Sequence, residues 1–401
     1  MRLPAPIRPL AVTAYTATSA LGRGVATHAQ ALHANRGGLR SNDFSSAPLQ
    51  CFIGRVDGLE DAPLPQALGD WECRNNRLAW LGLDQDGLLD AVQAAIGRYG
   101  ADRVALILGT STASIGASEE AYRRLEDGRF PRDLQRPGIH TPHSLTAFVA
   151  AATAIAGPAL TISTACSSSA KVFASAERMM RLGLVDAALV GGVDTLCDSV
   201  LFGFNALELV SPEPCRPFDA LRKGISIGEA AAFALLQRAD VAPDAPRLIG
   251  YGESSDAHHM STPHPHGRGA RAALDDALAR SGLREDQIDY VNLHGTATLK
   301  NDEVEAAMLG ERFPSRVRAS STKGFTGHTL GAAGGLEAVF ALIAIERGFV
   351  PGNLGCTQPE SACAQQLALR GEQREVRVAL SNSFGFGGNN ACLAFARAEA
   401  V

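Results

Sequence analysis

The stretch TISTACSSSAKVFASAERMMRLGL, residues 161–184, decides the fold class of this chain. It begins with β-branched residues, which are typical of a strand, passes through small residues around Cys166, and continues in an amphipathic pattern typical of a helix. A strand that turns directly into a helix is the repeating unit of α/β proteins. The same pattern places Cys166 at the start of that helix.

The segments on either side repeat this alternation. Short apolar runs that predict strands lie at 104–109 (VALILG), 160–164 (LTIST), 187–194 (AALVGGVD), 290–295 (YVNLHG) and 378–383 (VALSNS). Helical patterns separate them, so we expect an α/β fold. The polar, proline-containing segment VAPDAP (241–246) predicts a join between two related halves, residues 1–245 and 246–401.

Composition narrows the class of protein. The chain has 401 residues, 46% of them apolar, and 37 basic against 42 acidic side chains, so no global positive field exists to hold nucleic acid or a membrane surface. Its 41 glycines predict many tight turns. The eight cysteines show no zinc-ligand or disulfide-framework spacing. The N-terminal segment lacks an unbroken apolar core, so we expect a cytoplasmic protein with no membrane span.

Cys166 is a candidate nucleophile. A thiol at a helix N-terminus lies near unpaired amides and the positive end of the helix dipole, so we expect its pKa to fall. The neighbouring residues are small and would let a substrate approach. From Cys166 alone, a buried structural thiol is the more common interpretation, since free cysteine is among the most buried residue types.

Two histidines follow predicted strands or turns. His294 opens HGTATLKNDEVEA, and His328 lies in STKGFTGHTLGAAGG, five residues after Lys323. Two imidazoles that converge on a carbonyl oxygen can stabilise the negative charge that develops on it. Lys323 could hold a carboxylate or set the charge of the site. Each histidine taken singly would more often be a structural residue, and Lys323 could be a solvated lysine.

The last glycine-rich loop, SNSFGFGGNN (381–390), places Phe384 and Phe386 among glycines that include Gly387. Glycines allow a close backbone approach, so amides of this loop could form half of an oxyanion hole. The pattern is not GxGxxG and does not open a first βαβ unit, which disfavours a dinucleotide site.

Two other patterns suggest different chemistry. Four histidines lie close together in SDAHHMSTPHPHG, which suggests either a metal site or a loop that holds no metal; they are His258, His259, His264 and His266. GISIG (224–228) matches the GxSxG pattern with Ser226 as nucleophile. No strand is predicted before Ser226, so we expect it to be structural.

Taken together, four segments resemble the β-ketoacyl-acyl-carrier-protein synthases of the condensing-enzyme family: TACSSS (164–169), NLHGTATLKNDEVEA (292–306), STKGFTGHTLGAAGG (321–335) and SNSFGFGGNN (381–390). The resemblance implies the thiolase fold, with two similar halves in a five-layer αβαβα arrangement. A Cys-His-His set is similar to that of the elongating synthases. The resemblance implies no metal and no organic cofactor.

The same resemblance implies a role for each matching residue. Cys166 would accept an acyl group, and His294 and His328 would bind the malonyl thioester and stabilise the enolate left by decarboxylation. The amides of Cys166 and Phe386 would form the oxyanion hole, with Phe386 also a gate. The remaining residues carried over are Lys323 and Glu305 as a charged pair beside the histidines, Asp302 one turn before Glu305, Thr296 and Thr298 toward the pantetheine arm, and Phe384 and Gly387 toward the substrate.

The implied partners are an acyl carrier protein, in acyl- and malonyl-loaded forms, and a second synthase chain in a homodimer or a heterodimer. Glu208 lies where elongating synthases often place basic residues, so we expect five arginines to offer a replacement patch: Arg123, Arg124, Arg129, Arg132 and Arg136. Such departures favour a polyketide or aryl-polyene type over the housekeeping fatty acid enzyme. Two alternatives stay open, namely an acyltransferase that does not condense and a non-catalytic partner subunit.

Overall fold

The computed structural model describes residues 4–400, which form two five-stranded units. The first unit has the strand order β6-β5-β7-β9-β1. Its strands are β1 (Leu10–Ser19), β5 (Val104–Gly109), β6 (Ala159–Ile162), β7 (Ala187–Asp194) and β9 (Ala230–Arg238). β5 runs parallel to β6 and β7, whereas β9 runs antiparallel to β7 and β1. Every residue of β5 and β7 is buried, which explains their unbroken apolar sequences.

The second unit repeats this order as β12-β11-β15-β16-β10. Its strands are β10 (Arg247–Ser255), β11 (Tyr290–Asn292), β12 (Arg318–Ser320), β15 (Val378–Gly385) and β16 (Asn389–Ala396). The parallel and antiparallel relations match those of the first unit strand for strand. The two units join where Leu10 and Ala11 of β1 pair with Leu248 and Arg247 of β10. The boundary at residues 245/246 stays a prediction.

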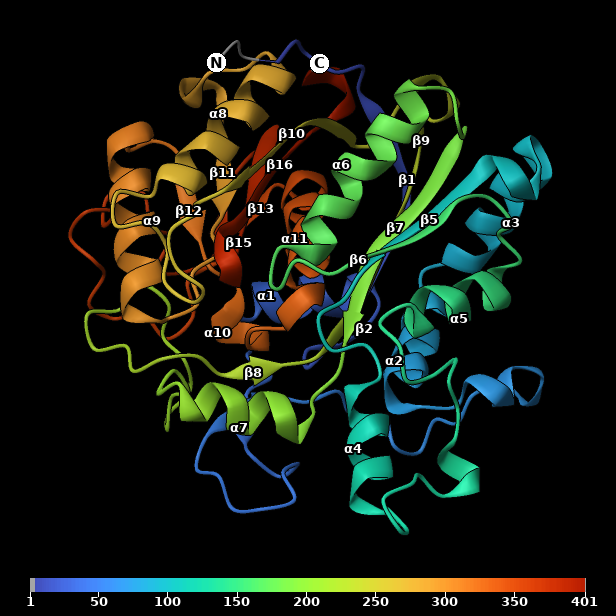
Figure 1. Cartoon of the computed structure of the whole chain (residues 1–401). Coiled ribbons are helices and arrows are strands. Elements are labelled where there is room, and N and C mark those ends of the chain that lie inside the picture. The colour runs from blue at the N-terminus through green and yellow to red at the C-terminus, as the bar shows by residue number, and fades with distance from the viewer. Residues whose placement is uncertain (1–3, 401) are drawn as a thin grey trace.

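Helices form three layers around these strands (Figure 1). α6 (Ser168–Arg181) and α11 (Ala333–Arg347) contact each other and strands of both units, so they form the middle layer. α11 is buried from Ala333 to Ile345, as expected of a helix that is apolar on all sides. The outer helices are α2 (Arg74–Leu83), α3 (Leu88–Tyr99) and α5 (Ser144–Thr153) on the first unit, and α8 (Arg268–Ser281) and α9 (Leu299–Arg312) on the second. The chain therefore has the predicted five-layer thiolase fold.

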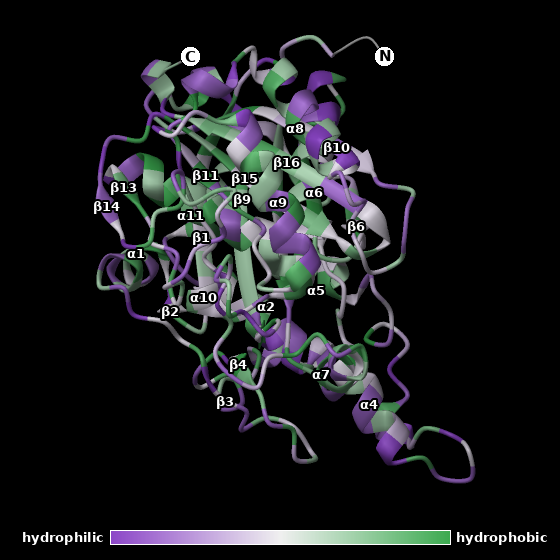
Figure 2. Cartoon of the chain, turned by 90° about the vertical axis from the view of Figure 1, so that its left-hand side faces the viewer, coloured by the Kyte–Doolittle hydropathy of each residue, from purple (hydrophilic) through white to green (hydrophobic). Residues whose placement is uncertain are grey.

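Shorter elements surround this body. They are α1 (Val25–His33), α4 (Ile115–Arg123), α7 (Asp198–Ala206), α10 (Lys323–Thr326), the edge strand β2 (Gly22–Arg23), and the small sheets β3-β4-β8 and β13-β14. The bounds of those two sheets are β3 (Arg40–Ser41), β4 (Phe52–Gly54), β8 (Ile227–Gly228), β13 (Phe349–Val350) and β14 (Glu372–Gln373). Figure 2 shows α4 and the loop after it projecting from the body. Between residues 4 and 400, no helix combines the length and the hydropathy that crossing a membrane requires.

Candidate active site

Cys166 lies in the turn between β6 and α6, as the sequence predicts. Its neighbour Ala165 has φ 52°, a left-handed conformation that turns the chain sharply ahead of the helix. The side chain of Cys166 is 6% exposed and opens onto a cavity of about 420 Å³. The thiol is therefore buried yet accessible from one side.

The expected fall in the pKa of Cys166 is wrong. Burial raises the pKa of this thiol to about 11, and it outweighs the opposing effects of the Lys323 charge and of the Phe386 backbone N–H. Desolvation disfavours the thiolate more than these two groups favour it. Cys166 is consequently a neutral thiol at rest and needs a base within reach.

His328 and His294 supply two nitrogens beside the sulfur. His328 Nε2 lies 3.0 Å from Cys166 Sγ, and the two imidazole rings meet edge to face with centroids 5.4 Å apart. Burial, together with the nearby Lys323 charge, lowers the pKa of both histidines well below the usual value. Both rings are therefore neutral near pH 7.

The backbone holds each histidine in place. His294 follows β11, and its N–H donates to Glu305 Oε1 at 2.9 Å, while the N–H of Gly295 donates to Glu305 Oε2 at 2.8 Å. His328 donates its N–H to the carbonyl oxygen of Ser226 at 2.7 Å. Ser226 thus has a structural role, as expected, and Glu305 holds the His294 turn.

The predicted charged pair between Lys323 and Glu305 is wrong. Lys323 Nζ, which is buried, forms its salt bridge with Glu337 of α11, and it also lies 3.4 Å from His294 Nδ1. Glu305 faces backbone amides and Asn382 instead. Burial raises the pKa of Glu337 and of Glu305 to about 7 in each case. Sequence reasoning missed Glu337 because it lies in the middle of an apolar helix.

Two of the remaining predicted residues, Asp302 and Gly387, do not line the cavity. Asp302 is fully buried and accepts the backbone N–H groups of Phe218 at 2.7 Å and Ala297 at 3.2 Å. Thr296 and Thr298 lie on the cavity wall with their hydroxyl oxygens 2.8 Å apart, and Phe384 and Phe386 line it as well. Gly387 is not among the lining residues; it adopts φ 76° and donates its N–H to Met260 O at 2.7 Å.

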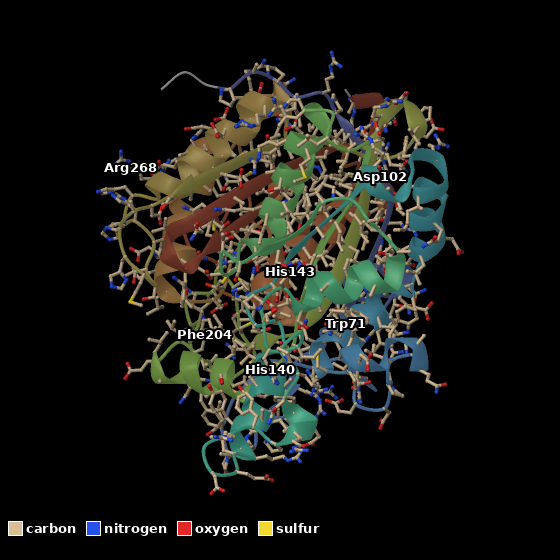
Figure 3. The ribbon with its side chains drawn as sticks, turned by 45° about the vertical axis from the view of Figure 1, so that its right-hand side comes forward. Trp71, Asp102, His140, His143, Phe204 and Arg268 are labelled. Carbon is tan, nitrogen blue, oxygen red and sulfur yellow. The ribbon has the colours of Figure 1, made fainter. Side chains whose placement is uncertain are left out.

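Phe204 was not predicted, yet it completes the cavity wall. It lies on α7, labelled in Figure 3, and its ring stacks on that of Phe386 with centroids 5.5 Å apart. The sequence around Phe204, DSVLFGFNA, gives no sign of this contact because the two residues are far apart in the chain. The gate predicted at Phe386 therefore has an aromatic partner.

Carboxylates neutralise part of the predicted arginine patch. Arg123 pairs with Asp198 and Glu119, and Arg124 pairs with Glu120 and Asp133. Arg129 and Arg132 are exposed, so the patch as a carrier-protein surface stays a prediction.

Among the described residues, one group of side chains could hold a metal ion. The ligand atoms of Cys166, His294 and His328 lie within 4.8 Å of one another, and thiolate with imidazole is a donor set that suits Zn²⁺. The four histidines of the 256–267 loop do not form such a group. A thiophilic cation would occupy the place where substrate must bind.

Known proteins resemble this chain over most of its length. The model described as "Beta-ketoacyl synthase, N-terminal domain" matches residues 78–242, and the one described as "Beta-ketoacyl synthase, C-terminal domain" matches residues 247–357. Nodulation protein E of Rhizobium meliloti is 34% identical over 304 residues, which are 73% of this chain and 75% of that protein. 3-Oxoacyl-[acyl-carrier-protein] synthase 2 of Synechocystis is 30% identical over 413 residues, which cover 96% of this chain and 97% of that protein.

Solved structures also resemble this chain. The solved structure of a ketosynthase in complex with its chain length factor, from Xenorhabdus doucetiae, superposes with a TM-score of 0.89 at 38% identity, covering 97% of this chain and 98% of the other. Motifs, fold and both halves of the family model agree, and the chain belongs to the β-ketoacyl synthases, condensing enzymes of the acyltransferase class.

Proposed function

We propose that this chain is a 3-oxoacyl-[acyl-carrier-protein] synthase in which Cys166 carries the growing acyl group. Cys166 Sγ attacks an acyl thioester and releases the thiol of the carrier. The malonyl thioester then loses CO₂, and the resulting carbanion attacks the acyl-Cys166 carbonyl. The C–S bond breaks, Sγ regains a proton, and the product is a 3-oxoacyl chain two carbons longer.

One observation carries this proposal: a thiol and two neutral imidazoles meet at the buried end of a single cavity. Decarboxylation builds negative charge on the thioester oxygen, and neutral N–H donors in a site shielded from water stabilise such charge strongly. A nucleophilic sulfur within reach of the same donors permits the carbon–carbon bond to form without moving the intermediate.

The position of Lys323 indicates which ring nitrogen of His294 carries the proton. Its ammonium group has only donors to offer, and it lies 3.4 Å from His294 Nδ1. Nδ1 therefore acts as the acceptor, and the ring proton resides on Nε2, which faces the site. This tautomer gives His294 the N–H donor that enolate stabilisation requires.

Substrate placement follows from the cavity walls. The backbone N–H of Phe386 opposes the rise in the pKa of Cys166, which supports its role in an oxyanion hole once a thioester carbonyl lies there. Thr296 and Thr298 offer hydroxyls along the wall for the amides of a pantetheine arm. Phe384 and Phe386 supply the apolar surface next to the reacting atoms.

We also propose the partners. The cavity opens among Lys223, Lys300 and Glu208, a mixed rim to which an acidic carrier protein would bring the substrate. A second synthase chain would pair with β6, which in the described chain is hydrogen-bonded only to β5 and leaves one edge available. The Xenorhabdus doucetiae neighbour was solved with a chain length factor, which supports a heterodimer as one form. Eight free buried thiols favour a cytoplasmic location, where thiols stay reduced.

The test combines two measurements on the full-length protein. Intact-mass spectrometry after incubation with acyl-carrier protein should show one acyl adduct that the Cys166→Ala variant lacks, and malonyl-carrier protein should release CO₂. His294→Ala should abolish CO₂ release, whereas His33→Ala, which changes an exposed histidine on α1, should not. An adduct without condensation would indicate an acyltransferase, and no adduct at all would indicate a non-catalytic subunit.

A further inference from the structure

Asp194 ends β7 as a fully buried carboxylate that the proposed chemistry does not use. Six neutral donor groups surround it. They are the hydroxyls of Thr110, Ser111 and Thr112, the backbone N–H groups of Ser111 and Thr112, and the backbone N–H of Gly331. A carboxylate that accepts hydrogen bonds from this many donors fixes the chain segments around it.

These donors come from both halves of the protein. Residues 110–112 follow β5 in the first half, whereas Gly331 lies three residues after His328 in the second half. The Gly331 N–H donates to Asp194 Oδ2 at 2.6 Å and lies 3.1 Å from Ser111 Oγ. Asp194 therefore connects the turn that contains His328, by a hydrogen bond, to the half of the chain that contains Cys166.

The turn that contains His328 has a strained backbone, which the hydrogen bond to Asp194 helps to hold. Leu330 has φ 57°, a left-handed conformation that a residue with a branched side chain rarely adopts unless its surroundings hold it. A Cβ on Gly331 would lie 2.6 Å from both Asp194 Oδ2 and the Ser111 nitrogen, so no side chain fits between the turn and its anchor. On its other side, His328 is held by main-chain bonds to Ser226 and Gly228.

We propose that Asp194 is a positioning residue for condensation, because its anchoring of Gly331 sets the 3.0 Å approach of His328 Nε2 to Cys166 Sγ. The inference rests on the proposed function for its effect on turnover. Its effect on the sulfur itself can be measured without any turnover.

Two variants separate geometry from charge. Asp194→Asn keeps the shape but turns an NH₂ group toward backbone N–H donors, and it also removes a negative charge that raises the pKa of Cys166. Ser111→Ala removes only the hydroxyl that bridges Asp194 and Gly331, and it leaves the charge in place. Asp289→Asn is the matched control, because Asp289 likewise accepts backbone N–H groups, those of Arg377 and Val378, at the far end of β15.

The first readout is alkylation of Cys166 by iodoacetamide at pH 8, followed by peptide mass spectrometry. We expect both variants to react more slowly, Asp194→Asn by about tenfold, because the sulfur loses its hydrogen-bond partner. Loss of the charge alone would accelerate alkylation, so a faster reaction in Asp194→Asn, or an unchanged rate in folded Ser111→Ala, overturns the proposal. If Asp194→Asn does not fold, Ser111→Ala decides alone.

The second readout is condensation. We expect kcat to fall by up to about a hundredfold in Asp194→Asn with KM for malonyl-carrier protein changed less than about twofold, since displacing a reacting group by roughly 1 Å has that effect while the cavity walls remain. Asp289→Asn should match the unsubstituted protein in both readouts. If the variants are alkylated more slowly but the unsubstituted protein itself never condenses, the positioning role is upheld and the proposed function is rejected. A normal kcat in folded Asp194→Asn would reject the positioning role alone.

Discussion

Removing the carboxylate of Glu337 should destabilise the protein more than any single exposed substitution. Lys323 and Glu337 are 1% and 3% exposed at their side chains and form a salt bridge with each other. Glu337→Gln leaves the Lys323 ammonium group buried without its counter-charge, and such a change costs about 3–5 kcal/mol. For a chain of 401 residues, with an unfolding entropy of about 2.1 cal/mol/K per residue, the midpoint of thermal unfolding should fall by about 4–6 °C.

The reverse substitution should cost less. In Lys323→Met the buried group left behind is Glu337, whose pKa already stands at about 7, so it can take up a proton and become neutral. The double variant Lys323→Met/Glu337→Gln removes both charges and should regain most of the stability that Glu337→Gln loses. A thermal and urea unfolding cycle of the four proteins measures the coupling between the two side chains.

Additive losses in that cycle would refute this reasoning, as would a Glu337→Gln variant within about 1 kcal/mol of the parent. Either result would mean that another group stabilises the buried charge of Lys323, for example the His294 carbonyl oxygen to which Lys323 also donates. Glu346→Gln is a suitable control, because this carboxylate accepts the Tyr15 hydroxyl in an exposed pair and should change stability little.

Three further outcomes are expected. Alkylation of Cys166 should keep accelerating up to about pH 11, the pKa that burial gives the thiol; a plateau below pH 8 would contradict this. Zn²⁺ should inhibit condensation and protect Cys166 from alkylation, reversibly with a chelator, because sulfur and two imidazoles converge there; inhibition without protection would argue against binding at this site. The pKa of Glu305 rises from 4.5 to about 7 on folding, so this side chain binds more protons in the folded state than in the unfolded state. Its contribution to stability is therefore complete below about pH 4.5 and is lost as the pH rises through about 7. Urea unfolding of Glu305→Gln across this range should show a flatter pH dependence than the parent.

The candidate nucleophile and both histidines could be located from sequence because each lies in a local pattern. Cys166 is marked by a strand, small residues and a helix in succession, and His294 and His328 lie in glycine-rich turns. Each pattern is contained within about a dozen residues. The strand–helix alternation that predicts the fold is local in the same sense.

Contacts between distant segments could not be found in this way. Glu337 lies in the buried helix α11, and only the packing of that helix against the Lys323 turn identifies it as the counter-charge. Phe204 meets Phe386 across the cavity from another helix. The pKa of Cys166 was predicted in the wrong direction because burial depends on the whole fold, whereas the helix start is visible in a few residues.

The division of the site between the two halves has a consequence for synthesis on the ribosome. Cys166 emerges and can fold within the first half well before residue 294 or residue 328 has been made. Until the second half docks, the thiol lacks the imidazole at 3.0 Å and the lysine that opposes its raised pKa. The group of one thiol and two imidazoles therefore exists only in molecules whose second half has been made and has folded against the first.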